Sequence, residues 1–162
     1  MRRWIIGILA ILVVSISIIG VGVSVYAVTK DDKVINMTGD IVEVLMSADT
    51  VELIENGNRC KIETDTFNNA INQTLEGAHA MPALGVALHE ETIAAMQEGF
   101  WIELIYDKEY MYNEMPFDKL LIQVRAEDSG FNIIRHYNNK YDGRCYYVSL
   151  AGDMAGVAEL FE

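Results

Sequence analysis

The stretch TVELIENGNRCKIET, residues 50–64, predicts a β-hairpin and gives the first information about the fold. Its centre is Asn56-Gly57, the pair most favoured in a two-residue type I′ turn, and strand-forming residues lie on both sides. Counting outward from the turn gives the pairs Glu55 with Asn58, Ile54 with Arg59, Leu53 with Cys60, Glu52 with Lys61, and Val51 with Ile62. This register places the apolar members on one face, as a half-buried sheet requires.

The rest of the chain from residue 40 alternates further strand-like and helix-like segments. Strands are predicted at 40–46, 100–107, 117–125, 131–137 and 144–150, and helices at 65–77, at 90–98 and after Asp153. Turn residues separate the last four strands, which favours an antiparallel meander. The predicted fold is α+β: an antiparallel sheet, made of the N-terminal hairpin and a four-strand meander, with helices packed on it.

The N-terminal segment differs from the rest of the chain because residues 4–28 contain no charge. This is longer than the roughly 20 residues that a transmembrane helix needs. Arg2 and Arg3 precede it, so the positive-inside rule predicts a cytoplasmic N-terminus and an exported remainder. We therefore expect an anchor at 1–29, a spacer at 30–39 and an exported domain at 40–162. If cleavage occurs after Ala27, the domain is secreted instead.

The chain has 162 residues and a formal net charge of −12. Nucleic acid is an unsuitable partner, because phosphate binding needs clustered cations that this sequence lacks. The acidic surface is expected to keep the domain soluble, or else to attract a basic protein. The expected partners are the membrane, through residues 4–28, and another protein.

The two cysteines, Cys60 and Cys145, have two competing interpretations. An exported domain meets an oxidising environment, so the first interpretation is one internal disulfide between them. A loop of 138–143 in the last hairpin would instead place His136 opposite Cys145, and a histidine beside a cysteine can generate a thiolate nucleophile.

No metal or cofactor is expected. The three histidines and two cysteines are dispersed, without the CxxC or HxH spacing of zinc sites. His89-Glu90-Glu91 resembles the start of a zinc-protease helix, but Ile93 stands where the second histidine ligand would be.

Two segments are candidate binding regions. The first, residues 78–91, joins two predicted helices with small and apolar residues, so it is either a buried connection packed against the sheet or a segment that lines a pocket or forms a lid. Its candidate residues are His79, Met81, Pro82, Gly85 and His89. The second is a predicted loop at 107–116, whose Tyr110, Met111 and Tyr112 could contact another protein, although packing in the core or in a hairpin is the alternative for these aromatic residues.

The sequence therefore predicts a single-pass, membrane-anchored extracytoplasmic domain that acts as a non-enzymatic binding or sensory module. One alternative is an acidic inhibitor or immunity-like module that binds a basic protein. The other is an exported thiol enzyme that uses Cys145 and His136.

Overall fold

The computed structural model describes residues 34–37, 40–84 and 89–162. The chain divides into two units, residues 1–35 and 36–162. Strand β1 (Val34–Met37) straddles this division, and all the other described helices and strands belong to the second unit. The predicted membrane anchor at 4–28 lies outside the described residues. Among the residues that are described, no helix is long and apolar enough to cross a membrane.

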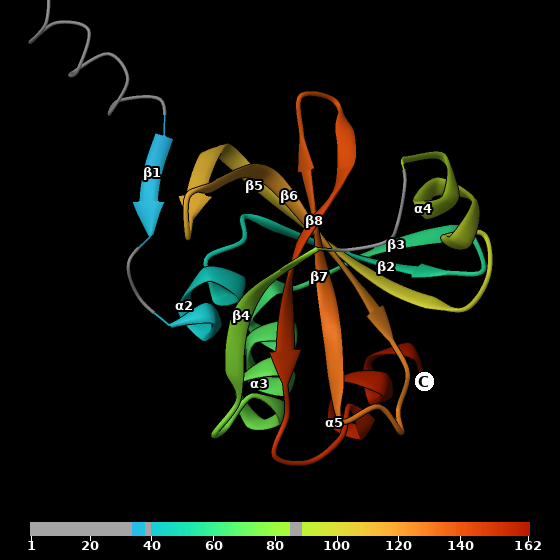
Figure 1. Ribbon diagram of the computed structural model, residues 1–162. Coiled ribbons are helices and arrows are strands. Elements are labelled where there is room, and N and C mark those ends of the chain that lie inside the picture. The colour runs from blue at the N-terminus through green and yellow to red at the C-terminus, as the bar shows by residue number, and fades with distance from the viewer. Residues whose placement is uncertain (1–33, 38–39, 85–88) are drawn as a thin grey trace, which may run out of the picture. The chain divides into compact units, whose positions relative to one another are not determined.

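Seven strands of the described chain form one antiparallel sheet, which confirms the predicted α+β class (Figure 1). Their order across the sheet is β3-β2-β5-β6-β7-β8-β4, so β3 and β4 are its edges. The bounds are β2 (Thr50–Glu55), β3 (Asn58–Ile62), β4 (His79–Leu84), β5 (Phe100–Tyr112), β6 (Met115–Val124), β7 (Gly130–Tyr137) and β8 (Lys140–Ser149).

The first hairpin, β2–β3, has the predicted register at all five residue pairs. Its turn residues have the positive φ angles that a type I′ turn requires, 47° at Asn56 and 82° at Gly57. The Oδ1 atom of Asn56 also accepts a hydrogen bond from the backbone N–H of Gly99, at 2.9 Å. The turn thus joins the hairpin to the start of the meander.

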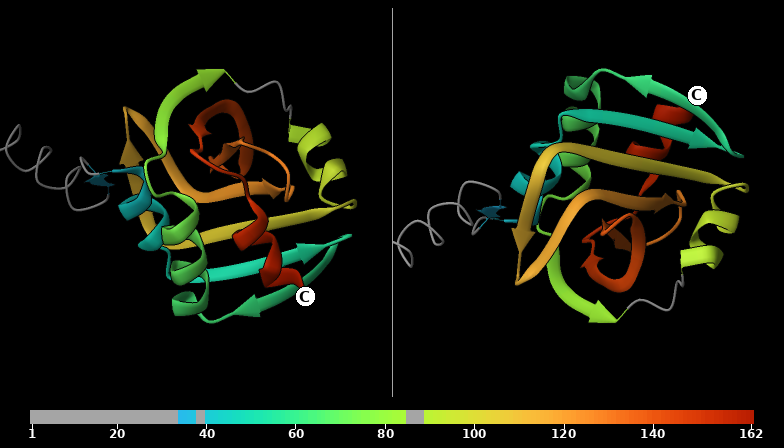
Figure 2. Two further views of the ribbon diagram at one scale, coloured as in Figure 1. Left: turned by 90° about the horizontal axis from the view of Figure 1, so that it is seen from below. Right: turned by 90° about the horizontal axis from the view of Figure 1, so that it is seen from above.

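Short helices cover the sheet unequally. Figure 2 shows α2 (Ile41–Met46), α3 (Thr64–Thr74) and α5 (Ala155–Ala158) on one side, with α4 (His89–Ala95) on the other. A 3₁₀ turn, η1 (Glu159–Phe161), follows α5. The larger core lies between the three-helix layer and the sheet, and it includes fully buried Phe67, Ile71, Leu104, Leu120 and Tyr146.

Residues 41–46 form helix α2, so the prediction of a strand at 40–46 was wrong. Isoleucine and valine favour strands, which suggested the strand. However, the residues that become buried are Ile41, Val44 and Leu45, at the i, i+3, i+4 spacing of a helix face. Packing of this face against the core overrides the local preference.

Strand β4 occupies part of the segment that we expected to be an inter-helix connection or lid. Residues His79–Leu84 pair antiparallel with β8, for example His79 with Ser149 and Leu84 with Arg144. Proline can occupy a strand here because β4 is at the edge, where one side of the backbone has no partner. The lid prediction was therefore wrong for this part of the segment, whereas Gly85 lies outside the described residues.

The predicted interface loop at 107–116 is also a regular hairpin. Strand β5 continues to Tyr112, the turn is Asn113-Glu114, and β6 starts at Met115. Tyr112 is buried, and the hydroxyl of Tyr146 donates to its carbonyl oxygen at 2.8 Å. The rings of Tyr110 and Phe117 stack with their centroids 6.1 Å apart. Tyr110, Met111 and Tyr112 thus belong to a strand and not to an exposed loop.

The β7–β8 hairpin has a shorter turn and a different register from the prediction. The turn is Asn138-Asn139, with φ angles of 52° and 60°, and His136 lies opposite Tyr141. A register shift then brings Ile134 opposite Cys145. Buried Arg135 holds this irregular region, because its Nη2 is 2.7 Å from Asp142 and its Nε donates to the carbonyl of Arg144. The predicted pairing of His136 with Cys145 was therefore wrong.

Candidate functional site

The sheet face away from α2, α3 and α5 carries a second, smaller core. It consists of Ile54, Met96, Trp101, Leu121, Ile134 and Tyr141. Met96 follows α4 directly, and its backbone N–H bonds the carbonyl of Thr92 at 3.2 Å, so the helical turn continues over these side chains. This small core separates two polar regions of the same face: a pocket beside α4, and a buried charged cluster.

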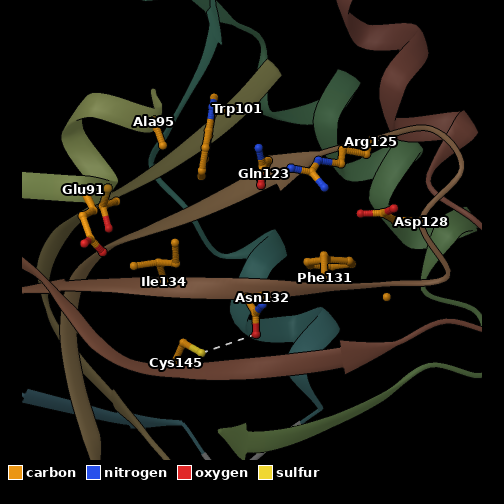
Figure 3. Close-up of a pocket in the computed structure, with 12 residues that line it drawn as sticks. Glu91, Ala95, Trp101, Gln123, Arg125, Asp128, Phe131, Asn132, Ile134 and Cys145 are labelled. Atoms are coloured by element: carbon orange, nitrogen blue, oxygen red, sulfur yellow. Dashed lines mark hydrogen bonds between the residues drawn. The ribbon is translucent and has the colours of Figure 1, made fainter. Parts of the chain in front are cut away.

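The pocket has a volume of about 490 Å³, within the range of about 300–1,000 Å³ typical of small-molecule sites. It lies between α4, the start of β5 and the connection from β6 to β7. In Figure 3, Glu91, Ala95 and Trp101 line one side, Ile134 and Asn132 the other, and Arg125 and Asp128 one end. The indole N–H of Trp101 donates to the carbonyl of Glu98 at 2.9 Å, which fixes the ring that forms part of the wall.

Thr92 lines the same pocket and is only 1% exposed. Its Oγ1 has no hydrogen-bond partner in the part of the chain that the structure describes. A buried hydroxyl without a partner costs about 1–3 kcal/mol. A polar ligand or a water molecule in the pocket would supply the missing hydrogen bond.

Arg125 and Asp128 bring one positive and one negative charge to the lining of the pocket. The backbone N–H of Asp128 bonds the carbonyl of Arg125 at 3.1 Å, so one turn holds both residues. Within the described residues, neither side chain makes an ion pair. The pocket therefore offers one cationic and one anionic group to a ligand, beside the apolar side chains of Trp101 and Ile134.

Cys145 lies at the pocket wall but is poorly suited to act as a nucleophile. Its side chain is fully buried, and its Sγ is 3.5 Å from the amide oxygen of Asn132. Burial raises the pKa of the Cys145 thiol, an effect that the charge of Arg135 opposes only in part. His136 instead has its Nδ1 2.6 Å from Asp118. The pair Cys145 and His136 that the thiol-enzyme interpretation needs is not assembled.

The predicted disulfide is also absent, since both cysteines are free thiols. Cys60 is exposed on the edge strand β3. It lies opposite Leu53, whose side chain belongs to the larger core, so Cys60 is on that face of the sheet. Cys145 pairs with Ile134 of the small core on the opposite face. Four strands and the thickness of the sheet separate the two residues, whereas a disulfide requires adjacent, converging Cβ atoms.

The charged cluster centres on Glu103, which is 2% exposed. Its carboxylate accepts hydrogen bonds from the Tyr141 hydroxyl and from Arg59, at 2.7 Å for the latter, and Lys119 lies 3.7 Å away. Arg59 also contacts Glu52 at 2.7 Å. Burial opposes the charge of Glu103, but these donors and cations outweigh burial and lower its pKa. Burial and the hydrogen bond to Glu103 raise the pKa of Tyr141. The cluster cross-links β2, β3, β5, β6 and β8.

The predicted pocket residues only partly coincide with this site. His79 is exposed at the start of β4 and does not line the pocket. The side chains of Met81, Pro82 and His89 lie outside the described part of the chain, as does Gly85, so their predicted role stays a prediction.

Five residues that line the pocket were not predicted from the sequence: Thr92, Trp101, Arg125, Asp128 and Asn132. They come from separate elements, so no sequence motif joins them. The one signal in the sequence that could have pointed to the pocket was the pair of opposite charges, Arg125 and Asp128, just before the turn Ser129-Gly130.

Within the described residues, no group of three or more histidine, cysteine, aspartate or glutamate side chains could hold a metal ion.

The antiparallel sheet and the pocket beside α4 define the class of this protein: an α+β domain with a pocket large enough for a small molecule. Comparisons with protein families, with characterised proteins and with solved structures find no match to this chain.

Proposed function

We propose that this protein is a membrane-anchored binding or sensory module whose exported domain binds a small molecule in the α4 pocket. The observation that carries the proposal is a pocket of about 490 Å³ whose lining residues include Thr92, a residue with a buried hydroxyl that has no hydrogen-bond partner among the described residues. Arg125 and Asp128 add support, because neither side chain makes an ion pair within the part of the chain that the structure describes. Catalysis is not part of the proposal, because burial raises the pKa of the Cys145 thiol at the pocket wall and Ile134, not His136, lies opposite it.

The anchor and the orientation of the domain rest on the sequence: residues 4–28 are uncharged and follow two arginines. Cys60 provides the test, because its thiol is exposed while Cys145 is buried. A membrane-impermeant maleimide should label Cys60 of the full-length chain on intact cells, and the Cys60→Ser variant should lose the label. Mass spectrometry of the tryptic peptides identifies the labelled cysteine. Labelling that appears only after the cells are permeabilised would contradict the proposed orientation.

The pocket can be tested by filling it. Ala95 lies on the rim, so Ala95→Trp should place an indole in the pocket and weaken small-molecule binding at least about tenfold. Ala94→Trp is the matched control, since Ala94 is also exposed on α4 but does not line the pocket. Saturation-transfer NMR with neutral, cationic, anionic and zwitterionic probes, including indole and the amino acids, measures the difference. If Ala95→Trp weakens no probe, the pocket proposal is wrong, and the acidic module that binds a basic protein becomes the better hypothesis.

A further inference from the structure

The charges around the pocket restrict what it can bind. The ionisable groups that line it are Arg125, Asp128, Glu91 and the thiol of Cys145. A simple anion would pair with Arg125 but meet the two carboxylates, and a simple cation would leave Arg125 without a partner. A ligand that carries both charges satisfies Arg125 and Asp128 together.

We propose that the pocket binds a free amino acid, or another small α-amino acid of the same zwitterionic form. This inference rests on the proposed function in one respect: it assumes that the pocket binds a small molecule. The α-carboxylate accepts hydrogen bonds from the guanidinium of Arg125, whose planar donors match a carboxylate. The α-ammonium donates to the carboxylate of Asp128. The two groups that the protein offers are three residues apart in one turn, which suits two ligand groups on one carbon atom.

The rest of the pocket fits the rest of such a ligand. Trp101 and Ile134 are buried apolar side chains in its wall, and Ala95 adds a small apolar surface at the rim. These residues can contact an apolar amino-acid side chain, which favours leucine-like ligands over charged ones. The hydroxyl of Thr92 is the buried polar group without a partner among the described residues, and it supplies one hydrogen bond to the ligand.

The experiment is isothermal titration calorimetry of the purified full-length chain in a mild detergent. Each of the twenty protein amino acids is titrated, and the tightest binder is compared with analogues that lack one charged group. For leucine these are 3-methylbutylamine, without the carboxylate, and 4-methylpentanoate, without the ammonium. Both analogues should bind at least about tenfold more weakly, because each loses a charge-assisted hydrogen bond.

Variants of the protein should give the matching result. Arg125→Gln and Asp128→Asn should each weaken amino-acid binding at least about tenfold, while Arg125→Gln should have little effect on 3-methylbutylamine. Thr92→Val should weaken binding about three- to tenfold, and Thr92→Ser should restore it. Arg144→Gln and Asp107→Asn are the controls. They make the same two kinds of substitution, each removing one charge, at exposed positions outside the pocket.

The outcomes separate this inference from the proposed function. Amino-acid binding that survives both Arg125→Gln and Asp128→Asn would overturn the zwitterion assignment. If indole binds and Ala95→Trp blocks it, but no amino acid binds, the pocket remains a small-molecule site and the inference alone is wrong. If Ala95→Trp affects no probe, both the proposed function and the inference are wrong.

Discussion

Replacing Arg59 by methionine should lower the free energy of unfolding by about 2–3 kcal/mol at pH 7. The variant leaves the carboxylate of Glu103, 2% exposed, without its nearest cation, and removal of one partner from a buried ion pair costs about 3–5 kcal/mol. The expected value lies below that range for two reasons. The Arg59 side chain is 44% exposed, so solvent screens its charge, and Lys119 remains 3.7 Å from the carboxylate.

The loss should depend on pH in a defined direction. The donors and cations around Glu103 hold its pKa below the ordinary value of 4.5, so the folded protein binds a proton less readily than the unfolded chain. The stabilisation is therefore fully present above about pH 4.5 and is lost as the pH falls through the lowered pKa of Glu103. Once Glu103 is protonated in both states, the guanidinium of Arg59 no longer has a charged partner there. The difference in unfolding free energy between the wild type and Arg59→Met should thus shrink below about pH 4.5.

Urea unfolding of the full-length chain in mild detergent, followed by tryptophan fluorescence between pH 3 and 8, measures this difference. Lys61→Met is the matched control, because Lys61 is exposed on the same face of β3 and makes no ion pair among the described residues. The control should change stability by less than about 0.5 kcal/mol. If the loss of unfolding free energy in Arg59→Met stays constant down to pH 3, then the ionised carboxylate of Glu103 is not what Arg59 stabilises.

Replacing Phe67 by alanine should lower the free energy of unfolding by about 3–5 kcal/mol, the largest effect that we expect. Phe67 lies on α3, is fully buried and belongs to the larger core that joins the helices to the sheet. Truncation removes its hydrophobic contribution and also leaves a cavity, because the surrounding side chains relax only in part. A native domain is stable by about 5–15 kcal/mol, so this single change could unfold much of the population.

Phe100→Ala is the control for Phe67→Ala. Phe100 is 39% exposed, and its ring contacts Phe161 with the centroids 4.9 Å apart. We expect this substitution to cost less than about 1.5 kcal/mol, because solvent already covers part of the ring and no closed cavity forms. Urea unfolding and far-ultraviolet circular dichroism of both variants test the difference. Equal losses for the two variants would contradict the core assignment of α3.

The sequence predicted the fold best where local chemistry and burial agree. Asn56-Gly57 fixes the β2–β3 turn by backbone conformation alone, so every pair of that hairpin was confirmed. The prediction was wrong for α2, because its β-branched residues favour a strand until the core selects a helix. It was also wrong for β4, where a proline is tolerated only because the strand lies at an edge. Neither the core nor the edge is visible in a local pattern.

The candidate site was much harder to predict. Thr92, Trp101 and Arg125 belong to α4, to β5 and to the residues after β6, and only the folded sheet brings them to one pocket.

The register of β7–β8 could not be predicted from the sequence either, because it also depends on contacts between distant residues. A turn of Asn138-Asn139 combined with a register shift beside Arg135 places Tyr141 opposite His136, whereas Cys145 was expected there. Since that shift accompanies the buried contacts of Arg135, a count from the turn alone could not find it.

The sequence by itself determined the α+β class, the first hairpin and the meander, because alternation and turn residues act over a few positions. It also provides the prediction of the anchor, which depends only on the length and apolarity of residues 4–28. The tertiary structure alone decided that Cys60 and Cys145 are free, that Glu103 is a buried charge, and that a buried hydroxyl and two opposite charges line one pocket. These features depend on which distant strands become neighbours, and that follows from packing of the whole sheet.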